Sequence, residues 1–108
     1  MRVNVYSTSL GPNEQVTLLV SPLAIQSILY GEIDSKEAGT ISMSAGTDGV
    51  TFADTASLVL NPLVVGKQLL PLNSNPGNVY MRISANKHAR VFMAGPDLSV
   101  RELIRANL

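Results

Sequence analysis

The side chain best suited to acid–base chemistry is the single histidine, His88. It stands in a predicted loop beside Lys87 and Arg90. A catalytic histidine needs a partner that orients its ring, and the neighbouring sequence supplies none. No serine offers a replacement nucleophile, because none lies in a Gly-x-Ser-x-Gly elbow. We therefore expect His88 to be a solvated loop residue and the chain to have no catalytic residues.

Acidic side chains near turns are the next candidates, since paired carboxylates catalyse glycoside hydrolysis and acidic loops bind calcium. They are Glu32, Asp34, Glu37, Asp48 and Asp54. Their spacing does not match an EF-hand loop, so solubilising groups are the leading interpretation and a weak calcium site is the alternative. Gly66-Lys67 lacks the remainder of a phosphate-binding loop. These patterns predict no metal site, no cofactor and no enzymatic activity.

Composition narrows the remaining functions. The 108 residues carry eight basic and eight acidic side chains without a basic cluster, which disfavours nucleic-acid binding. No cysteine is present, which fits a reducing compartment. We expect no signal peptide, because Met1-Arg2 is followed by alternating residues. The apolar stretch 16–30 is interrupted by Ser21-Pro22 and is too short for a membrane span.

The elements that would position these residues are predicted to be strands. Turn residues recur at short intervals, and segments such as 40–44 and 79–84 alternate between apolar and polar side chains. The sequence therefore predicts a mainly β fold, an antiparallel β-sandwich resembling a jelly roll, over residues 1–95. Segments 79–84 and 89–94 are expected to form an antiparallel hairpin with an exposed tip.

Residues 96–108 are predicted to differ from the rest and to form a short capped C-terminal helix. Ser99 and Glu102 have the spacing of a capping box, and Leu98 and Leu103 stand at the positions of a hydrophobic staple. Val100, Leu103, Ile104 and Leu108 would share one apolar face. A helix this short must pack on its own sheet or on a neighbouring subunit.

Apolar residues make up 45% of the chain and charged residues only 15%, which is more apolar surface than one small sandwich covers easily. Self-association explains this surplus, while central strands covered by the helix are an equal alternative. We expect the interface in the terminal segments and in the apolar stretch near residue 25. The candidate interface residues are Val3, Val5, Tyr6, Leu23, Ile25, Leu29, Val100, Leu103, Ile104 and Leu108.

Two segments resemble known families. Residues 41–52, ISMSAGTDGVTF, look like the strand-turn-strand of galactose-binding-like sandwiches, and residues 79–93, VYMRISANKHARVFM, are similar to the closing hairpin of small phage virion proteins. Size, neutral charge and lack of cysteine also fit the cement or decoration proteins of tailed-phage capsids. The resemblance implies an oligomeric jelly-roll-like subunit that binds at capsomer junctions.

The leading hypothesis is therefore a virion structural protein, assembled in the host cytoplasm. Its expected partners are copies of itself, including as a trimer, and the major capsid protein or another virion protein. Membranes and nucleic acids are not expected partners. The alternatives are another head or tail accessory subunit, a carbohydrate-binding module that uses the Asp48-Gly49 turn, and, ranked last, a small enzyme.

Overall fold

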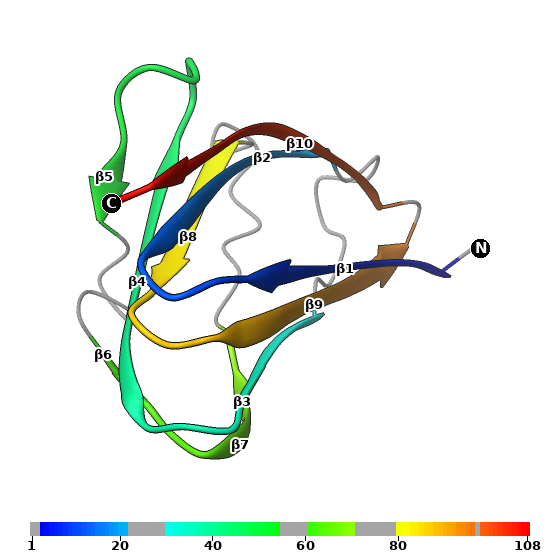
Figure 1. Cartoon of the computed structure of the whole chain (residues 1–108). Coiled ribbons are helices and arrows are strands. Elements are labelled where there is room, and N and C mark those ends of the chain that lie inside the picture. The colour runs from blue at the N-terminus through cyan, green and yellow to red at the C-terminus, as the bar shows by residue number, and fades with distance from the viewer. Residues whose placement is uncertain (1–2, 22–29, 55–60, 71–79, 97) are drawn as a thin grey trace.

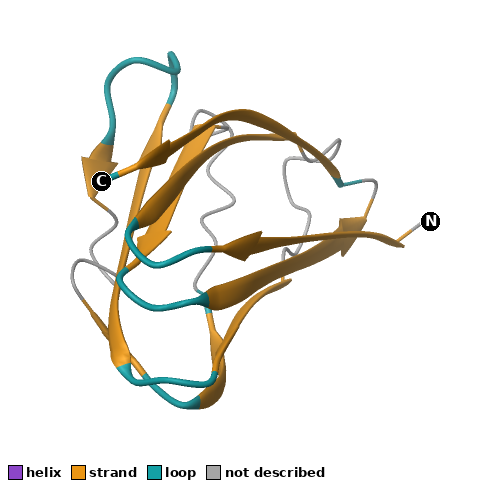
Figure 2. Ribbon diagram, in the orientation of Figure 1, coloured by secondary structure: helices purple, strands orange, loops and turns teal. Residues whose placement is uncertain are grey.

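The structure is a computed structural model, and it describes residues 3–21, 30–54, 61–70, 80–96 and 98–108 (Figure 1). These residues form strands and loops without a helix (Figure 2). The strands are β1 (Val3–Leu10), β2 (Glu14–Ser21), β3 (Tyr30–Ser35), β4 (Gly39–Gly46), β5 (Ala53–Asp54), β6 (Asn61–Leu63), β7 (Gly66–Leu69), β8 (Tyr80–Ala85), β9 (Ala89–Pro96) and β10 (Ser99–Asn107).

Two antiparallel sheets make up the fold, which confirms the predicted mainly β class. The four-stranded sheet has the order β1-β9-β3-β7. The six-stranded sheet has the order β10-β2-β8-β4-β5, and β6 also pairs with β4. All registered pairs are antiparallel. Figure 1 shows the two sheets facing one another, with β1 and β9 on one side and β2 and β8 on the other.

The strands pair in a nested order. Strand β1 pairs with β9, β2 with β8, β3 with β7, and β4 with β6. Strands that are adjacent in the chain, such as β1 and β2 or β3 and β4, therefore lie in different sheets. Each short connection between such strands is an arch that crosses from one sheet to the other.

The prediction that residues 79–94 form a hairpin is wrong, because strands adjacent in the chain lie in different sheets. Its two arms exist as β8 and β9, but β8 pairs with β2 and β4, whereas β9 pairs with β1 and β3. The connection at residues 86–88 crosses between the sheets, so the inward side chains of both arms face one another across the core. Ile83 on β8 and Val91 on β9 are both fully buried in the same cluster.

The core fills the space between the sheets with aliphatic side chains. Alternate residues of the long strands point inward, as in β4, where Ile41 and Met43 are buried between less buried serines. Both sheets contribute to one continuous cluster of buried residues. Its largest fully buried side chains are Leu10, Val16, Leu18, Ile33, Ile41, Met43, Leu63, Ile83, Val91 and Met93.

Polar contacts join the arches to one another at one end of the two sheets. The buried Ser35 hydroxyl donates to the carbonyl oxygen of Glu37 at 2.8 Å and lies 3.1 Å from that of His88. The Asn86 side-chain oxygen accepts the Thr40 N–H at 2.8 Å. These bonds join the turn between β3 and β4 to the arch between β8 and β9, and they satisfy backbone groups that pair in neither sheet.

The expected C-terminal helix is also wrong. Residues Ser99–Asn107 form β10, which pairs along its length with β2 at the edge of the six-stranded sheet. The register shifts between Glu102, opposite Leu18, and Ile104, opposite Thr17, so that Leu103 is the extra residue of a β-bulge. Pairing with β2 satisfies backbone groups along the whole segment, which outweighs a local capping signal.

Candidate interaction surface

The outer face of the four-stranded sheet carries apolar side chains from all four of its strands. Alternation turns Val3 and Val5 of β1 outward, with exposed fractions of 63% and 61%. The register places Val5 beside Ala94 of β9, and Ala94 beside Tyr30 of β3. We call this surface the apolar patch and define it as Val3, Val5, Tyr30, Leu69, Phe92, Ala94 and Pro96.

Two aromatic rings stiffen the middle of the apolar patch. The rings of Tyr30 and Phe92 meet edge to face, with centroids 6.3 Å apart and planes at 74°. The Tyr30 hydroxyl donates to a carboxylate oxygen of Glu32 at 2.9 Å. This hydrogen bond raises the pKa of Tyr30 above its ordinary value of 10.0, so the phenol stays neutral at physiological pH. A neutral, fixed ring is suited to burial against a partner.

The same face becomes charged at the end nearest the arches. There the register aligns Ser9, Arg90, Asp34 and Lys67 across the four strands. An open depression of about 690 Å³ adjoins this row, and His88 lies in its wall. The depression is lined by Ser9, Pro12, Asp34, Lys36, Glu37, His88, Ala89 and Arg90. Its mixed charges give the polar border that commonly surrounds an apolar contact surface.

A second exposed region follows the free edge of β10. Leu103, Ile104 and Leu108 have exposed fractions of 38%, 60% and 72%. Within the described residues β10 pairs with β2 alone, so no described strand pairs with its opposite edge. Such an edge presents backbone donors and acceptors to any strand that approaches it.

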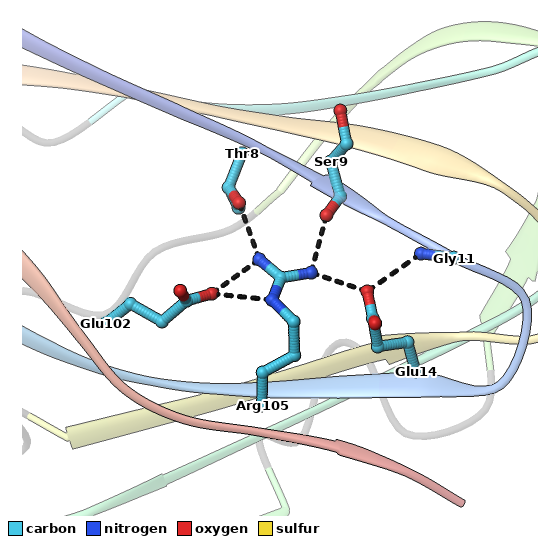
Figure 3. Close-up of polar contacts among 6 residues, drawn as sticks. All are labelled: Thr8, Ser9, Gly11, Glu14, Glu102 and Arg105. Atoms are coloured by element: carbon cyan, nitrogen blue, oxygen red, sulfur yellow. Dashed lines mark hydrogen bonds and ion pairs between the residues drawn. The ribbon is translucent and has the colours of Figure 1, made fainter.

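Arg105 anchors β10 to the other sheet (Figure 3). Its Nη1 donates to the Ser9 carbonyl oxygen at 2.6 Å and to Glu14, and its Nη2 donates to the Thr8 hydroxyl at 2.7 Å and to Glu102. Its Nε donates to Glu102 at 2.8 Å. All five N–H groups of the guanidinium therefore have acceptors within the subunit.

Glu14 completes this anchor. Its Oε1 accepts the Gly11 backbone N–H at 3.0 Å, in addition to the Arg105 contact (Figure 3). The Gly11 hydrogen bond, followed by that of Arg105, lowers the pKa of Glu14 below its ordinary value of 4.5. The carboxylate is therefore ionised near neutral pH and holds the turn between β1 and β2 against β10.

The candidate interface residues separate into groups. Val3 and Val5 belong to the apolar patch, and Leu103, Ile104 and Leu108 lie at the β10 edge. Tyr6 and Val100 are partly buried and pack against the core. Burial raises the pKa of Tyr6 above 10.0. Leu23, Ile25 and Leu29 lie outside the described residues.

The sequence interpretation missed the other half of the apolar patch. Tyr30, Leu69, Phe92 and Ala94 come from three strands, and only the pairing of β9 with β1 and β3 brings them together. The alternation within β9, where Phe92 and Ala94 fall between buried residues, signals that they point outward. Nothing in the local sequence signals which strands lie beside them.

The Asp48-Gly49 turn, the feature that suggested sugar binding, is occupied by local contacts. The Asp48 carboxylate accepts the backbone N–H groups of Thr51 at 2.8 Å and Val50 at 2.9 Å. These bonds, with Thr51 contributing most, lower the pKa of Asp48 below 3.8. Next to this turn, the Phe52 ring lies 3.9 Å beneath the Arg82 guanidinium carbon. The contacts fold the loop against the outer face of the six-stranded sheet.

The part of the chain that the structure describes contains no group of three His, Asp or Glu side chains able to hold a metal ion. It also contains no helix long and apolar enough to cross a membrane. In comparisons with known proteins, no family model, curated protein or solved structure matches the chain.

Proposed function

We propose that the chain is a structural subunit of a virus particle, most specifically a capsid decoration or cement protein that stabilises capsomer junctions. In this role it carries out no reaction. It binds copies of itself and the major capsid protein, or another virion protein, and it resides in the virion after assembly in the host cytoplasm. A head or tail accessory subunit would use the same surfaces.

The nested strand order supports this proposal. Eight strands pair first with last, second with next to last, and inward to β4 with β6. We interpret this order as a jelly roll, with β10 added at one edge and the short β5 beside β4. Jelly rolls occur in viral capsid proteins, and they also occur in lectins and cupins. The strand order alone therefore does not identify the function, which must be inferred from the exposed surface.

The apolar patch is the observation that carries the proposal. Val3, Val5 and Leu69 each leave more than 60% of their surface exposed, on the same face of the sheet as an aromatic pair. Exposed apolar surface of this kind marks contacts with other proteins. Aliphatic side chains offer no hydrogen bonds to sugar hydroxyls, so the patch suits a protein partner better than a glycan. Its burial would contribute about 25 cal/mol per Å², before association costs are subtracted.

The proposal is tested by binding to shells assembled from the major capsid protein of the virus whose genome encodes this chain. Val5→Lys places a charge in the apolar patch, and Val50→Lys is the matched control at a valine that is 77% exposed in the loop at residues 47–52. We expect the wild type and Val50→Lys to cosediment with shells and Val5→Lys to bind at least about tenfold more weakly. Failure of the wild type to bind, or equal binding by the two variants, would overturn the proposal.

A further inference from the structure

The bulge in β10 determines which residues of its free edge share a face. Leu103 and Ile104 together stand opposite Thr17, so the two residues occupy one position of the ladder. Counting outward from that position, Glu102 and Arg105 are the first neighbours, and Arg101 and Ala106 are the second. Without the bulge, members of each pair would point to opposite faces of the sheet.

The register with β2 shows that each pair shares a face. Glu102 stands opposite Leu18 and Arg105 opposite Val16, two residues apart on β2. Arg101 stands opposite Leu19 and Ala106 opposite Gln15, four residues apart. Even separations on a strand keep side chains on the same face. Counted in ladder positions, β10 therefore keeps across the bulge the same-face alternation that a regular strand has about any residue, so an antiparallel copy can pair with it there.

From the exposed apolar residues of this edge and the opposite charges that flank its bulge, we propose that a second copy of the chain docks here, β10 against β10, around a two-fold axis at the Leu103–Ile104 bulge. Two six-stranded sheets would then join into one continuous sheet. The proposal deepens the packing role proposed above by naming the partner and its register. It does not depend on a capsid, so the two proposals can fail separately.

Charge supports the symmetric register. It places Glu102 of each copy opposite Arg105 of the other, and the two bulges face one another with Leu103 and Ile104 between the chains. The attraction between the charges is coulombic, since the Arg105 N–H groups already have acceptors in their own subunit. Opposite charges on facing strands stabilise a ladder, whereas like charges destabilise it.

Neighbouring registers that preserve the faces are disfavoured by the same charges. If the two-fold axis moves by one ladder position, from the bulge to Arg105, then Arg105 of one copy stands opposite Arg105 of the other. If the axis moves by one position to Glu102 instead, the two Glu102 side chains stand opposite one another. Charged side chains on an edge strand normally protect it from pairing, but here they would select one register.

Cysteine cross-linking tests the register, because the chain has no cysteine of its own. In the proposed dimer Arg101 of one copy faces Ala106 of the other, and both residues are exposed in the subunit. Facing Cα atoms lie about 4.5 to 5.5 Å apart, within the reach of a disulfide. Arg101 of one copy lies about four ladder positions, roughly 13 Å, from Arg101 of the other, and the same holds for Ala106. A disulfide cannot span that distance.

We expect a mixture of Arg101→Cys and Ala106→Cys proteins, one carrying a mass tag, to oxidise to the mixed dimer. Each variant alone should remain uncross-linked. The matched control is Ser7→Cys mixed with Arg101→Cys, because Ser7 lies on the outer face of the other sheet. Cross-linking of either variant with itself, or no excess of the mixed dimer over the control, would overturn the register.

Sedimentation of the cysteine-free protein provides an independent test. We expect the wild type and Val50→Lys to sediment as dimers, and the exposed double variant Leu103→Lys/Ile104→Lys to dissociate at least about tenfold more readily. Far-ultraviolet circular dichroism would verify that this variant keeps its strands. A monomeric wild type, a trimer without a dimer, or a dimer unaffected by the two lysines would overturn the proposed edge contact.

Discussion

Arg105 shows how one charged side chain can have a structural role on an exposed strand. Isolated surface ion pairs contribute little to stability, because solvent and salt screen them. Arg105 instead contacts a hydroxyl, a backbone carbonyl and two carboxylates on three strands, and its side chain is 28% exposed. A network of charge-assisted hydrogen bonds with fixed geometry contributes more than its separate pairs. This network fixes β10 to β1 and β2.

The network makes stability depend on pH through Glu14. Its pKa in the folded protein is below the ordinary 4.5, so the unfolded chain takes up the proton first as the pH falls. The stabilisation is therefore complete above about pH 4.5 and is lost as the pH decreases through the lower folded pKa. We expect Glu14→Gln to flatten the fall of the urea unfolding midpoint between about pH 5 and pH 3.

Glu37→Gln, in the turn between β3 and β4, is the control for this measurement. It removes a carboxylate that lies outside the Arg105 network and leaves the Gly11 and Arg105 contacts in place. Its unfolding midpoint should follow the wild-type pH dependence. A Glu14→Gln profile parallel to that of the wild type would contradict the assignment of the pH dependence to Glu14.

At the scale of elements, β10 is the strand whose removal is most informative. A terminal helix resting on the sandwich could be deleted without loss of the sheets. A strand cannot, because β10 covers the edge of β2 and carries Val100, which packs on the core, and Arg105. We expect deletion of residues 99–108 to lower the thermal unfolding midpoint by several degrees and to promote aggregation through the newly exposed β2 edge.

Removal of Leu108 alone, which follows β10 and is 72% exposed, is the control for this deletion. It removes one backbone hydrogen bond, to the Asn13 carbonyl oxygen, and should lower the unfolding midpoint far less than the full deletion does. A protein lacking residues 99–108 that stays soluble, with an unchanged midpoint, would show that β10 contributes nothing to the sandwich.

The strands themselves were predictable, because alternation of apolar side chains reports which residues face a core. Segments 40–44 and 79–84 fall within β4 and β8 as expected. Alternation does not report which sheet a strand joins, since the arms of a hairpin and of an arch have the same pattern. Ala85 and Ala89, both buried on either side of the arch, are compatible with both arrangements.

The error at the C-terminus has a physical origin in the bulge. The extra residue at Leu103 shifts the alternation, so Val100, Leu103 and Ile104 acquire the spacing of a helical face. Among the candidate interface residues, the outward direction of Val3 and Val5 could be predicted from the sequence, because they alternate with residues that are partly buried. Phe92 and Leu69 were not, because their place in the apolar patch depends on pairing between strands distant in the chain.

For the whole molecule, the nested strand order determines how folding must proceed. Val3 pairs with Pro96, so the outermost ladder closes nearly the entire chain, while the innermost pair of β4 and β6 is more local. Chains dominated by distant contacts fold slowly, because the entropy of closing long loops is lost before the contacts form. We expect folding in milliseconds to seconds, measured by stopped-flow circular dichroism after dilution from urea.

A control is available in the same experiment, since the rates extrapolated to water must reproduce the equilibrium stability if folding has two states. Complete recovery of the strand signal in under about a tenth of a millisecond would contradict the dependence on distant pairing. The Arg105 contacts join the last strand to the turn between the first two, so they can form only after much of the chain has been arranged.

The positions of the first and last described residues, Val3 and Leu108, have a mechanical consequence. Strand β1 starts at Val3, opposite Pro96, whereas Leu108 lies at the far end of the sandwich, where its N–H donates to the Asn13 carbonyl oxygen at 2.7 Å (Figure 1). A stretching force between the ends would therefore run nearly parallel to β1 and β10. It would load their ladders in shear, so that many hydrogen bonds must break together rather than one after another. A molecule pulled through Val3 and Leu108 would resist tension in this direction better than one whose outer strands could peel away.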